Sequence, residues 1–548
     1  MLYHLMLLSS VGLSAASQME TPTAESTNAD RLSLRSFKTL LSDPSGALAS
    51  WDNASLHFCR WRGVTCRNHG GEPRVSDLKL ESLKLEGELS PSLANLTFLR
   101  RLHLGNNNLE GSIPQELGLL PHLRTLNLSN NHLGGMIPTS LFLNCTRLQI
   151  FDLSHNNMSG TIPRNFGNCS ELQAIGLDRN MLEGEIPSDI ASLTKLKAIV
   201  IWTNRLTGSI PPEIGNLRFL TTLILGDNHL NGTIPATLGN LSSLVNLDLS
   251  RNLLAGVIPP TLWNLTSLDQ LVLVHNSLTG VIPSDIGNLV RLTYLTLFEN
   301  LLVGTIPPTL GSLTKLEILF LGYNKLDARN AADWRFLDAL TNSSHLTIFD
   351  ISVNQLGGVL PKSIANLSKS LEMLHVGGNQ ISGNIPTEIG NFMSLTEIDA
   401  SSNLLHGTIP PTLGGLPRLQ RLHLGRNQFA REIPATIGNL SSLVELDLSG
   451  NYFVGEIPAT LGELPRLNLL QLDDNQLHGT IPPSLGKCPL ETLNLASNKL
   501  TVECVSSVLR VGILCSKESP KERMDMEDVI RELHDIRDAF LGLPQWQE

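Results

Sequence analysis

The chain has 548 residues and a formal charge of -11 at neutral pH, and it is rich in leucine, glycine, proline and asparagine but poor in aromatic residues. A chain of this length usually contains several domains, but it also suits one short unit repeated many times, and the biased composition favours repeats. The negative charge excludes nucleic acid and anionic membrane surfaces as expected partners, because both attract positively charged proteins.

The first 17 residues have the pattern of a secretory signal peptide. The run from Leu5 to Leu13 is apolar but too short to cross a bilayer, and Ala15 and Ser17 are small residues where signal peptidase reads them. We therefore expect cleavage after Ser17 and a secreted, extracellular protein. A leader without a targeting role is the alternative, since His4 stands where Lys or Arg is usual. No later stretch reaches about 18 uninterrupted apolar residues, so the sequence predicts no membrane anchor.

Residues 28–74 are predicted to form a cap at the start of a repeat array. An amphipathic helix is expected within residues 30–51, with four apolar side chains on one face: Leu34, Phe37, Leu40 and Leu41. The stretch from Cys59 to Cys66 reads CRWRGVTC and resembles the paired-cysteine cap of plant leucine-rich-repeat receptors. That resemblance implies a disulfide between Cys59 and Cys66 and a Trp61 side chain that covers the first coil. In an oxidising compartment such a bond restrains a small cap.

Residues 75–502 repeat a unit of 24 residues with the consensus LxxLxLxxNxLxGxIP. Alternation such as that of Leu102, His103 and Leu104 predicts a short strand with its leucines facing inward. One unit cannot bury its own leucines, so the units must stack and their strands must form a parallel sheet. We count eighteen units, a degenerate one at Val75 and seventeen that begin at Leu99, Leu123, Leu148, Leu172, Leu196, Leu220, Leu244, Leu268, Leu292, Leu316, Leu346, Leu371, Leu395, Leu419, Leu443, Leu467 and Leu490.

An asparagine recurs nine positions into the unit, as at Asn107, Asn131 and Asn180, where the chain turns away from the strand. A buried amide there can donate to and accept from backbone groups, which predicts an asparagine ladder. The continuation LxGxIP, first seen from Leu109 to Pro114, resembles the extracellular class of plant leucine-rich repeats. That resemblance implies an α/β repeat solenoid, namely a right-handed superhelical leucine-rich-repeat horseshoe with a parallel concave sheet, a second short sheet and an N-terminal disulfide cap.

Cys145 and Cys169 occupy equivalent positions in successive units. We interpret them as two small buried apolar side chains rather than as a disulfide, since free cysteine is among the most buried residue types. The seven cysteines of the chain leave one unpaired in any pairing scheme.

Asn-x-Ser/Thr sequons are dense in the repeats, as expected of a secreted protein. Five of them lie in a recurring Asn-Leu-Ser/Thr segment, where the asparagine side chain is expected to reach solvent. These five are the predicted glycosylation sites: Asn95, Asn240, Asn264, Asn366 and Asn439.

The unit that begins at Leu316 is longer than the others and replaces LxGxIP with residues 327–342. Apolar and charged residues alternate in this insertion, which predicts one or two helical turns. The apolar residues are Trp334, Phe336, Leu337 and Leu340. The insertion resembles one in the subgroup of plant immune receptor kinases that detect bacterial peptides or proteins. The resemblance implies a receptor-kinase ectodomain, and a leucine-rich-repeat co-receptor kinase as a partner near the carboxy-terminal repeats.

Outward-facing strand residues form the usual recognition surface of a solenoid. Most units place polar residues there, but the units from Leu196 to Leu316 place apolar and aromatic ones, spaced at about 4.8 Å per unit. Contiguous exposed aromatic residues mark binding sites, unless glycans or the superhelical twist cover them. The predicted ligand-binding residues are Val200, Trp202, Ile224, Val272, Val274, Tyr294, Phe298, Phe320 and Tyr323. A second, basic surface at Arg421, His423 and Arg426 either meets an acidic group or is merely solvated.

Residues 503–548 depart from the repeat and resemble the end of the kinase domain in the same receptor subgroup, with Arg523 at a position that pairs with a glutamate there. The sequence contains no transmembrane helix, phosphate loop, strand lysine, catalytic aspartate or metal-binding aspartate of a kinase. We therefore expect an inactive remnant that needs no cofactor or metal. Three- and four-residue apolar spacing predicts an amphipathic helix over residues 525–541.

Taken as a whole, the sequence predicts extracellular recognition of a peptide or protein ligand in plant immune or developmental signalling, without kinase activity. The alternative is a secreted inhibitor of a pathogen's cell-wall-degrading enzyme, bound through the same concave surface. An enzyme is disfavoured because histidines such as His103 and His275 are scattered singly, with no nucleophile or metal-binding constellation around them.

Overall fold

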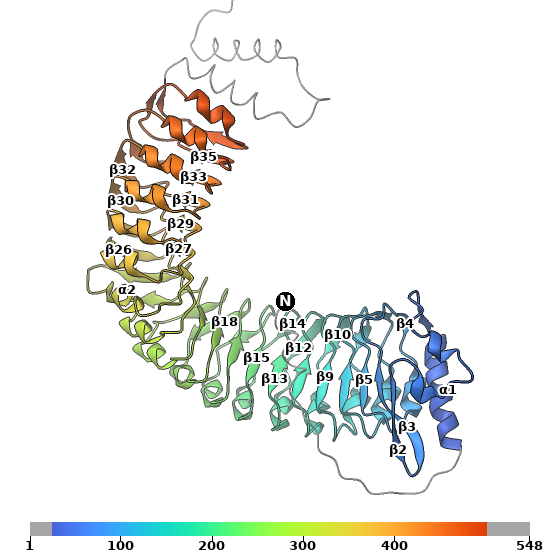
Figure 1. Ribbon diagram of the computed structural model, residues 1–548. Helices are drawn as coiled ribbons and strands as arrows, with labels where there is room; N and C mark the ends of the chain where they lie inside the picture. The colour runs from blue at the N-terminus through green and yellow to red at the C-terminus, as the bar shows by residue number, and fades with distance from the viewer. Residues whose placement is uncertain (1–24, 501–548) are drawn as a thin grey trace, which may run out of the picture. The chain divides into compact units, whose positions relative to one another are not determined.

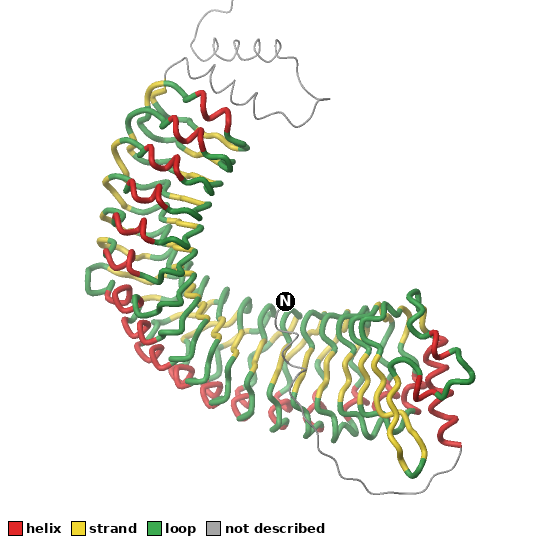
Figure 2. Tube along the Cα trace, in the orientation of Figure 1, coloured by secondary structure: helices red, strands yellow, loops and turns green. Residues whose placement is uncertain are grey.

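The computed structural model describes residues 25–500, and the chain divides into two compact units between Leu220 and Thr221. Each unit is a stack of coils, with strands on one side of the coil and a short helix on the other (Figures 1 and 2). The predicted signal peptide (1–17) and kinase remnant (503–548) lie outside the described residues. Within residues 25–500, no helix has the length and apolarity needed to cross a membrane.

The first unit contains a main sheet whose strands follow one another in chain order. β2 and β3 form an antiparallel hairpin, and each later strand pairs in parallel with the one before it. The strands are β2 (Val64–His69), β3 (Glu72–Lys79), β5 (Arg101–His103), β7 (Thr125–Asn127), β9 (Ile150–Asp152), β11 (Ala174–Gly176) and β13 (Ala198–Val200). The flank of the unit carries shorter pairings of β1 (Leu41–Ser42), β4 (Glu86–Glu88) and β6 (Asn108–Glu110), and of β8 (Gly134–Met136), β10 (Asn157–Thr161), β12 (Met181–Glu185) and β14 (Arg205–Thr207).

The second unit continues the same pattern with a main sheet that is parallel throughout. Its strands are β15 (Thr222–Ile224), β17 (Asn246–Asp248), β19 (Gln270–Val272), β21 (Tyr294–Thr296), β23 (Ile318–Phe320), β25 (Ile348–Asp350), β27 (Met373–His375), β29 (Glu397–Asp399), β31 (Arg421–His423), β33 (Glu445–Asp447), β35 (Leu469–Gln471) and β37 (Thr492–Asn494). The flank strands are β16 (Asn231–Gly232), β18 (Leu253–Val257), β20 (Ser277–Thr279), β22 (Val303–Gly304), β24 (Lys325–Ala328), β26 (Gln355–Val359), β28 (Gln380–Gly383), β30 (Leu404–Gly407), β32 (Gln428–Arg431), β34 (Tyr452–Phe453), β36 (His478–Gly479) and β38 (Lys499–Leu500).

Opposite the main sheet, almost every coil carries a short 3-10 helix (Figure 2). In the cap these helices are η1 (Ala49–Trp51) and η2 (Phe58–Arg60), and in the first unit's repeats they are η3 (Pro91–Asn95), η4 (Gln115–Leu119), η5 (Thr139–Phe142), η6 (Arg164–Asn168), η7 (Ser188–Ser192) and η8 (Pro212–Asn216). The second unit has η9 (Ala236–Asn240), η10 (Pro260–Asn264), η11 (Ser284–Asn288), η12 (Pro308–Ser312), η13 (Lys362–Asn366), η14 (Thr387–Asn391), η15 (Pro411–Gly415), η16 (Ala435–Asn439), η17 (Ala459–Glu463) and η18 (Pro483–Lys487).

The long insertion forms an α-helix, α2 (Arg335–Leu340), in the place where other units have the 3-10 helix. The predicted helical turns are therefore confirmed. Trp334 anchors the helix, because its Nε1 donates to the carbonyl oxygen of Gly357 at 2.9 Å and its ring stacks on Phe336 at 5.7 Å between centroids. Leu337 and Leu340 are fully buried beside them.

Leucines and asparagines hold the coils together as the repeat predicts. Strand leucines such as Leu295 are completely buried, so each coil completes its core against its neighbours. The asparagine ladder is confirmed and Asn300 is typical of it. Its Oδ1 accepts from the Leu278 backbone N–H at 3.1 Å, and its Nδ2 donates to the carbonyl oxygens of Leu273 at 2.9 Å and Leu297 at 3.1 Å. The amide of the asparagine at position nine of the unit therefore satisfies backbone groups of three segments at once.

The cap contains the Cys59–Cys66 disulfide that the resemblance implies. Trp61 is 2% exposed and stacks on Trp51 with ring centroids 5.4 Å apart, so two indoles close the end of the core.

The cap helix, α1 (Glu25–Thr39), buries Leu34 and Phe37 as predicted. It ends one residue before Leu40, which is 45% exposed. The placement of Leu40 and Leu41 on the helix's apolar face is therefore wrong. Leu41 instead belongs to β1 and pairs with Gly87 of β4, so strand pairing ends the helix before its apolar periodicity does.

Cys145 and Cys169 form a disulfide, with their Cα atoms 4.9 Å apart, and the interpretation as two free thiols is wrong. Equivalent positions of stacked coils lie about one strand spacing apart, which falls within the Cα separation that a disulfide requires. Cys488, the remaining cysteine of the described residues, is buried.

Replacing both Cys145 and Cys169 with serine is expected to lower the free energy of unfolding of the first unit by about 3 kcal/mol. The cross-link joins residues 24 apart, and the chain-entropy cost of an open loop of that length sets this magnitude. Urea unfolding of the oxidised double variant beside the oxidised wild type measures the loss. An unchanged unfolding midpoint would show that stacking alone holds these two coils.

Candidate ligand-binding surface

The apolar residues predicted to bind a ligand lie on main-sheet strands or within three residues after them, and none of them is fully buried. In the second unit, strand register places Val272 beside Thr296, and Thr296 beside Phe320. Phe298 follows β21, and its ring lies 4.9 Å from Tyr323 and 6.3 Å from Phe320 between centroids. We call Phe298, Phe320 and Tyr323 the aromatic cluster. Tyr323 is 49% exposed, so the cluster presents aromatic edges to solvent from two successive coils.

A polar position interrupts the predicted stripe within the second unit. Asp248 stands between Ile224 and Val272 in the strand register, and its carboxylate accepts from the Ser250 hydroxyl at 2.6 Å. Burial raises the pKa of Asp248, although the bonds from Ser250 oppose this. Burial and the Asp248 charge also raise the pKa of Tyr294. The apolar surface therefore begins at Val272, and Ile224 lies beyond a carboxylate.

Val200 and Trp202 belong to the first unit, on and just after β13. The Arg179 guanidinium lies 4.8 Å from the centroid of the Trp202 ring, a cation–π contact that holds the half-exposed indole in place. The nine predicted ligand-binding residues thus comprise two residues of the first unit and seven of the second.

The predicted basic surface is an ion-pair network in the structure. Arg421 bridges Glu397 and Glu445 at 3.1 and 3.2 Å, and His423 Nε2 lies 3.2 Å from the second oxygen of Glu445. Carboxylates on the neighbouring strands contact two of the three residues of the predicted basic surface. The expectation of a basic patch is therefore wrong at Arg421 and His423, and these carboxylates are the residues that the sequence interpretation missed.

His375 continues this network toward β25. Its Nδ1 lies 3.7 Å from Asp350 and its Nε2 lies 3.1 Å from Glu397. Burial would lower the pKa of His375, but contact with the two carboxylates outweighs burial and raises it to about 9. Contact with His375, opposed by burial and aided by the Arg421 charge, lowers the pKa of Glu397 to about 2.

Substituting His375→Gln is expected to destabilise the second unit in a pH-dependent way. The raised His375 pKa means that its stabilising charge contributes fully below its unfolded value near 6.5 and is lost as pH rises through about 9. The lowered Glu397 pKa contributes above its unfolded value near 4.5 and is lost only as pH falls through about 2. The difference in the free energy of unfolding between the wild type and the variant should therefore be largest between about pH 4.5 and pH 6.5, on the order of 2 kcal/mol. It should shrink at alkaline pH. Urea titrations across this range measure it, and a gap that does not vary with pH would contradict the charged state of His375.

All five predicted glycosylation asparagines are exposed. Each is the last residue of a 3-10 helix, as Asn95 is of η3 and Asn240 is of η9. Asn127 also fits a sequon but is only 4% exposed and accepts a hydrogen bond from Ser129. The structure therefore separates sequons open to solvent from those used by the core.

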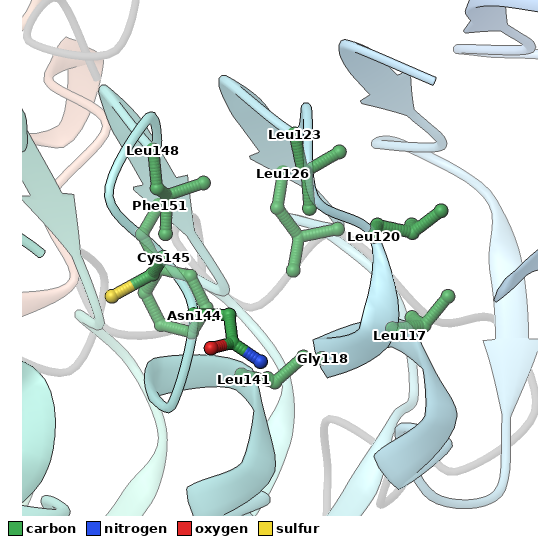
Figure 3. A pocket seen from close by; sticks show the side chains of 10 residues that line it. All are labelled: Leu117, Gly118, Leu120, Leu123, Leu126, Leu141, Asn144, Cys145, Leu148 and Phe151. Carbon is green, nitrogen blue, oxygen red and sulfur yellow. The ribbon is translucent and has the colours of Figure 1, made fainter. Parts of the chain in front are cut away.

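Two interior voids in the described coils are too small to hold a ligand. One void of about 10 Å³ lies between Leu117, Cys145 and Phe151, and Figure 3 shows the apolar side chains that close around it. The other, of about 20 Å³, is lined by apolar residues around Leu374. A single water needs about this much space, so both are packing gaps. Within residues 25–500, no group of three or more His, Cys, Asp or Glu side chains is arranged to hold a metal.

Comparison with known families agrees with this architecture. The leucine-rich-repeat N-terminal domain model matches residues 27–67. Leucine-rich-repeat models match residues 218–278, 393–453 and 417–477, and further single repeats at 98–120, 122–143, 147–169, 345–367 and 370–392.

Two curated relatives are receptor kinases. The chain is 44% identical over 79 residues to receptor kinase-like protein Xa21 of Oryza sativa subsp. japonica, and 45% identical over 75 residues to the LRR receptor-like serine/threonine-protein kinase EFR of Arabidopsis thaliana. Each match covers 14% of this chain, but only 8% of Xa21 and 7% of EFR. The chain is thus matched to a small part of each receptor.

Two similar solved structures are more extensive matches. The plant peptide hormone receptor RGFR1 in complex with RGF2 has a TM-score of 0.71 and 36% identity, covering 81% of this chain and 72% of that one. The Arabidopsis receptor kinase HAESA, in complex with the peptide hormone IDA and the co-receptor SERK1, has a TM-score of 0.69 and 34% identity, covering 89% of this chain and 88% of that one. With its capped stack of plant-type repeats, the chain belongs to the leucine-rich-repeat receptor kinase family of plants, and residues 25–500 have the fold of that family's ectodomains.

Proposed function

We propose that the second unit recognises an extracellular peptide or protein ligand through the aromatic cluster. The observation that carries this proposal is the gathering of Phe298, Phe320 and Tyr323 at the surface of the main sheet, with Val272 and Val274 on the coil before that of Phe298. Aromatic anchors dominate binding energy at protein interfaces because they bury a large area at low entropic cost. The similar ectodomain of HAESA is bound to a peptide hormone, which supports the same class of ligand here.

The double substitution Phe298→Ala with Phe320→Ala is expected to weaken ligand binding by at least about 100-fold, because each hot-spot aromatic contributes about 2 kcal/mol or more. A ligand is first selected by panning the purified full chain against a displayed library of extended peptides. Calorimetry then gives the Kd of the selected peptide for the wild type and the variant.

The matched control is Tyr452→Ala, which removes a 54% exposed aromatic side chain from β34 on the flank of the same unit. This control should bind as tightly as the wild type. Equal affinity of the aromatic-cluster variant and the wild type would overturn the assignment of the surface. Inhibition of a wall-degrading glycosidase by the wild type, with no peptide selected, would favour the inhibitor alternative.

We also propose that the chain belongs to the immune subgroup of the family and pairs with a co-receptor kinase near its carboxy-terminal repeats. The buried Trp334 and Phe336 of the α2 insertion support the subgroup, because they make the insertion a folded part of the core. The co-receptor in the HAESA complex supports the pairing. Panning against secreted bacterial proteins and against plant peptides separates immune from developmental ligands.

We propose that this chain acts as a secreted decoy that binds ligand without phosphorylating a substrate. The support lies in the sequence, where the repeat array passes directly into residues 503–548, which resemble only the end of a kinase domain. A transcript that reads across codons 495–510 without further sequence would support this arrangement. A transcript that inserts a membrane span and a kinase domain there would overturn it.

A further inference from the structure

Four arginines cluster along the edge of the first unit where the main-sheet strands begin. Arg67 lies on β2, while Arg100, Arg124 and Arg147 precede β5, β7 and β9. The backbone N–H of Arg124 donates to the carbonyl oxygen of Arg100 at 2.7 Å, so these two arginines sit at the same position of adjacent coils. Figure 1 shows the β2–β3 hairpin beside β5 at this end of the unit.

Within residues 25–500, none of these four arginines forms an ion pair with a carboxylate, and the Asp77 charge that acts on Arg100 belongs to the ion pair of Arg101. The side chains of Arg67, Arg100 and Arg124 make no hydrogen bond or ion pair there, and Arg147 donates only to His122 Nδ1, at 2.9 Å. Burial lowers the pKa of Arg100, and the charges of Arg67, Arg124 and Arg147 lower it further, while the Asp77 charge opposes them. Like charges held this close repel one another, in a chain whose overall charge is negative.

Neighbouring arginines show that this arrangement is not the rule in the fold. Arg101, the residue after Arg100, forms an ion pair with Asp77, and Arg421 in the second unit pairs with glutamates on both neighbouring strands. The edge arginines therefore differ from arginines that the chain uses to hold its own strands together.

An aromatic ring lies within the arginine cluster. Phe98 is half-exposed, and the centroids of the His69 and His122 rings lie 4.1 and 5.7 Å from its own. The guanidinium of Arg74 stands 4.5 Å from the Phe98 centroid and is itself anchored by Asp30. The edge thus combines a partly exposed aromatic ring with cations that have no carboxylate partner, which suits a ligand that has both anionic groups and apolar surface.

We propose that Arg67, Arg100, Arg124 and Arg147, with Phe98, bind a linear polyuronate, an acidic polysaccharide of the plant extracellular matrix. Each sugar of such a chain carries one carboxylate and extends it by roughly one strand spacing, ~5 Å, so two successive carboxylates match Arg100 and Arg124 on successive coils. Guanidinium groups bind carboxylates with two parallel hydrogen bonds. The solvent-exposed part of Phe98 offers an apolar contact to a sugar ring beside these cations.

The test is calorimetry of the purified full chain with an unesterified oligogalacturonate of defined length. The wild type should bind it, with affinity that falls as salt is raised, and should not bind the methyl-esterified oligomer, which lacks the charges. Arg100→Gln with Arg124→Gln should weaken binding by about tenfold or more, while leaving the melting temperature unchanged. The matched control, Arg164→Gln with Arg218→Gln, removes the same charge from exposed positions of the same unit and should bind like the wild type.

Failure of the wild type to bind, or equal binding of the esterified oligomer, would overturn the proposal without any variant being needed. If the Arg100/Arg124 variant and the Arg164/Arg218 control lose the same affinity, binding is general charge attraction to the protein. That result also overturns a defined site. Tighter binding of an acidic peptide, such as oligoglutamate, would replace the polysaccharide by a protein partner. The Phe298→Ala and Phe320→Ala variant should retain oligogalacturonate binding, so this result is independent of the peptide-binding proposal.

Discussion

Replacing Asp30 with alanine is expected to lower the free energy of unfolding of the cap by about 3–5 kcal/mol, because it leaves a buried guanidinium without its counter-charge. Asp30 is fully buried on α1 and accepts from Arg74 Nε at 3.0 Å and Nη2 at 2.8 Å. It also accepts from the Val75 backbone N–H at 2.9 Å. One carboxylate thus joins the cap helix to the first main-sheet hairpin.

Thermal and urea unfolding of Asp30→Ala beside the wild type measure this loss. The matched control is Asp52→Ala, which breaks the Lys38–Asp52 ion pair of the same cap, where the aspartate side chain is 73% exposed. Solvent screens that pair, so the control should lose far less stability. If both variants lose the same free energy of unfolding, burial is not the reason that the Asp30–Arg74 pair stabilises the cap.

The second large effect is expected from the asparagine ladder. Asn300→Ala should lower the free energy of unfolding by about 3–5 kcal/mol, because it leaves the Leu278 N–H and the carbonyls of Leu273 and Leu297 buried without partners. The loss should be local at first, since neighbouring coils support one another only in pairs.

Urea unfolding measures the total loss, and hydrogen exchange shows which coils it affects. The backbone N–H of Leu278 should lose its protection from exchange in the variant. Asn288→Ala is the control, because Asn288 ends η11 in the preceding coil and is exposed. It should leave both exchange and unfolding close to those of the wild type. Retained protection at Leu278 would indicate that water replaces the amide at little cost.

The repeat itself was predictable from the sequence because its determinants are local and occur many times. Each unit shows which residues face inward, where the chain turns, and which amide must satisfy the turn, as Asn300 and Leu295 illustrate. The exposure of the nine predicted ligand-binding residues followed from the same alternation, since side chains alternate between the two faces of a strand. What they bind stays a prediction.

The tertiary structure decided what depends on contacts between coils. Cys145 and Cys169 form a bond because stacking brings equivalent positions to 4.9 Å, a distance that composition does not reveal. Arg421 lost its predicted role because Glu397 and Glu445, 24 residues to either side, lie on the adjoining strands. The cap helix ended before Leu40 because β1 pairs with β4. Local periodicity therefore determined the coil and its outward residues, whereas the charge, covalent links and continuity of the surface depended on which residues of neighbouring coils the stacking places side by side.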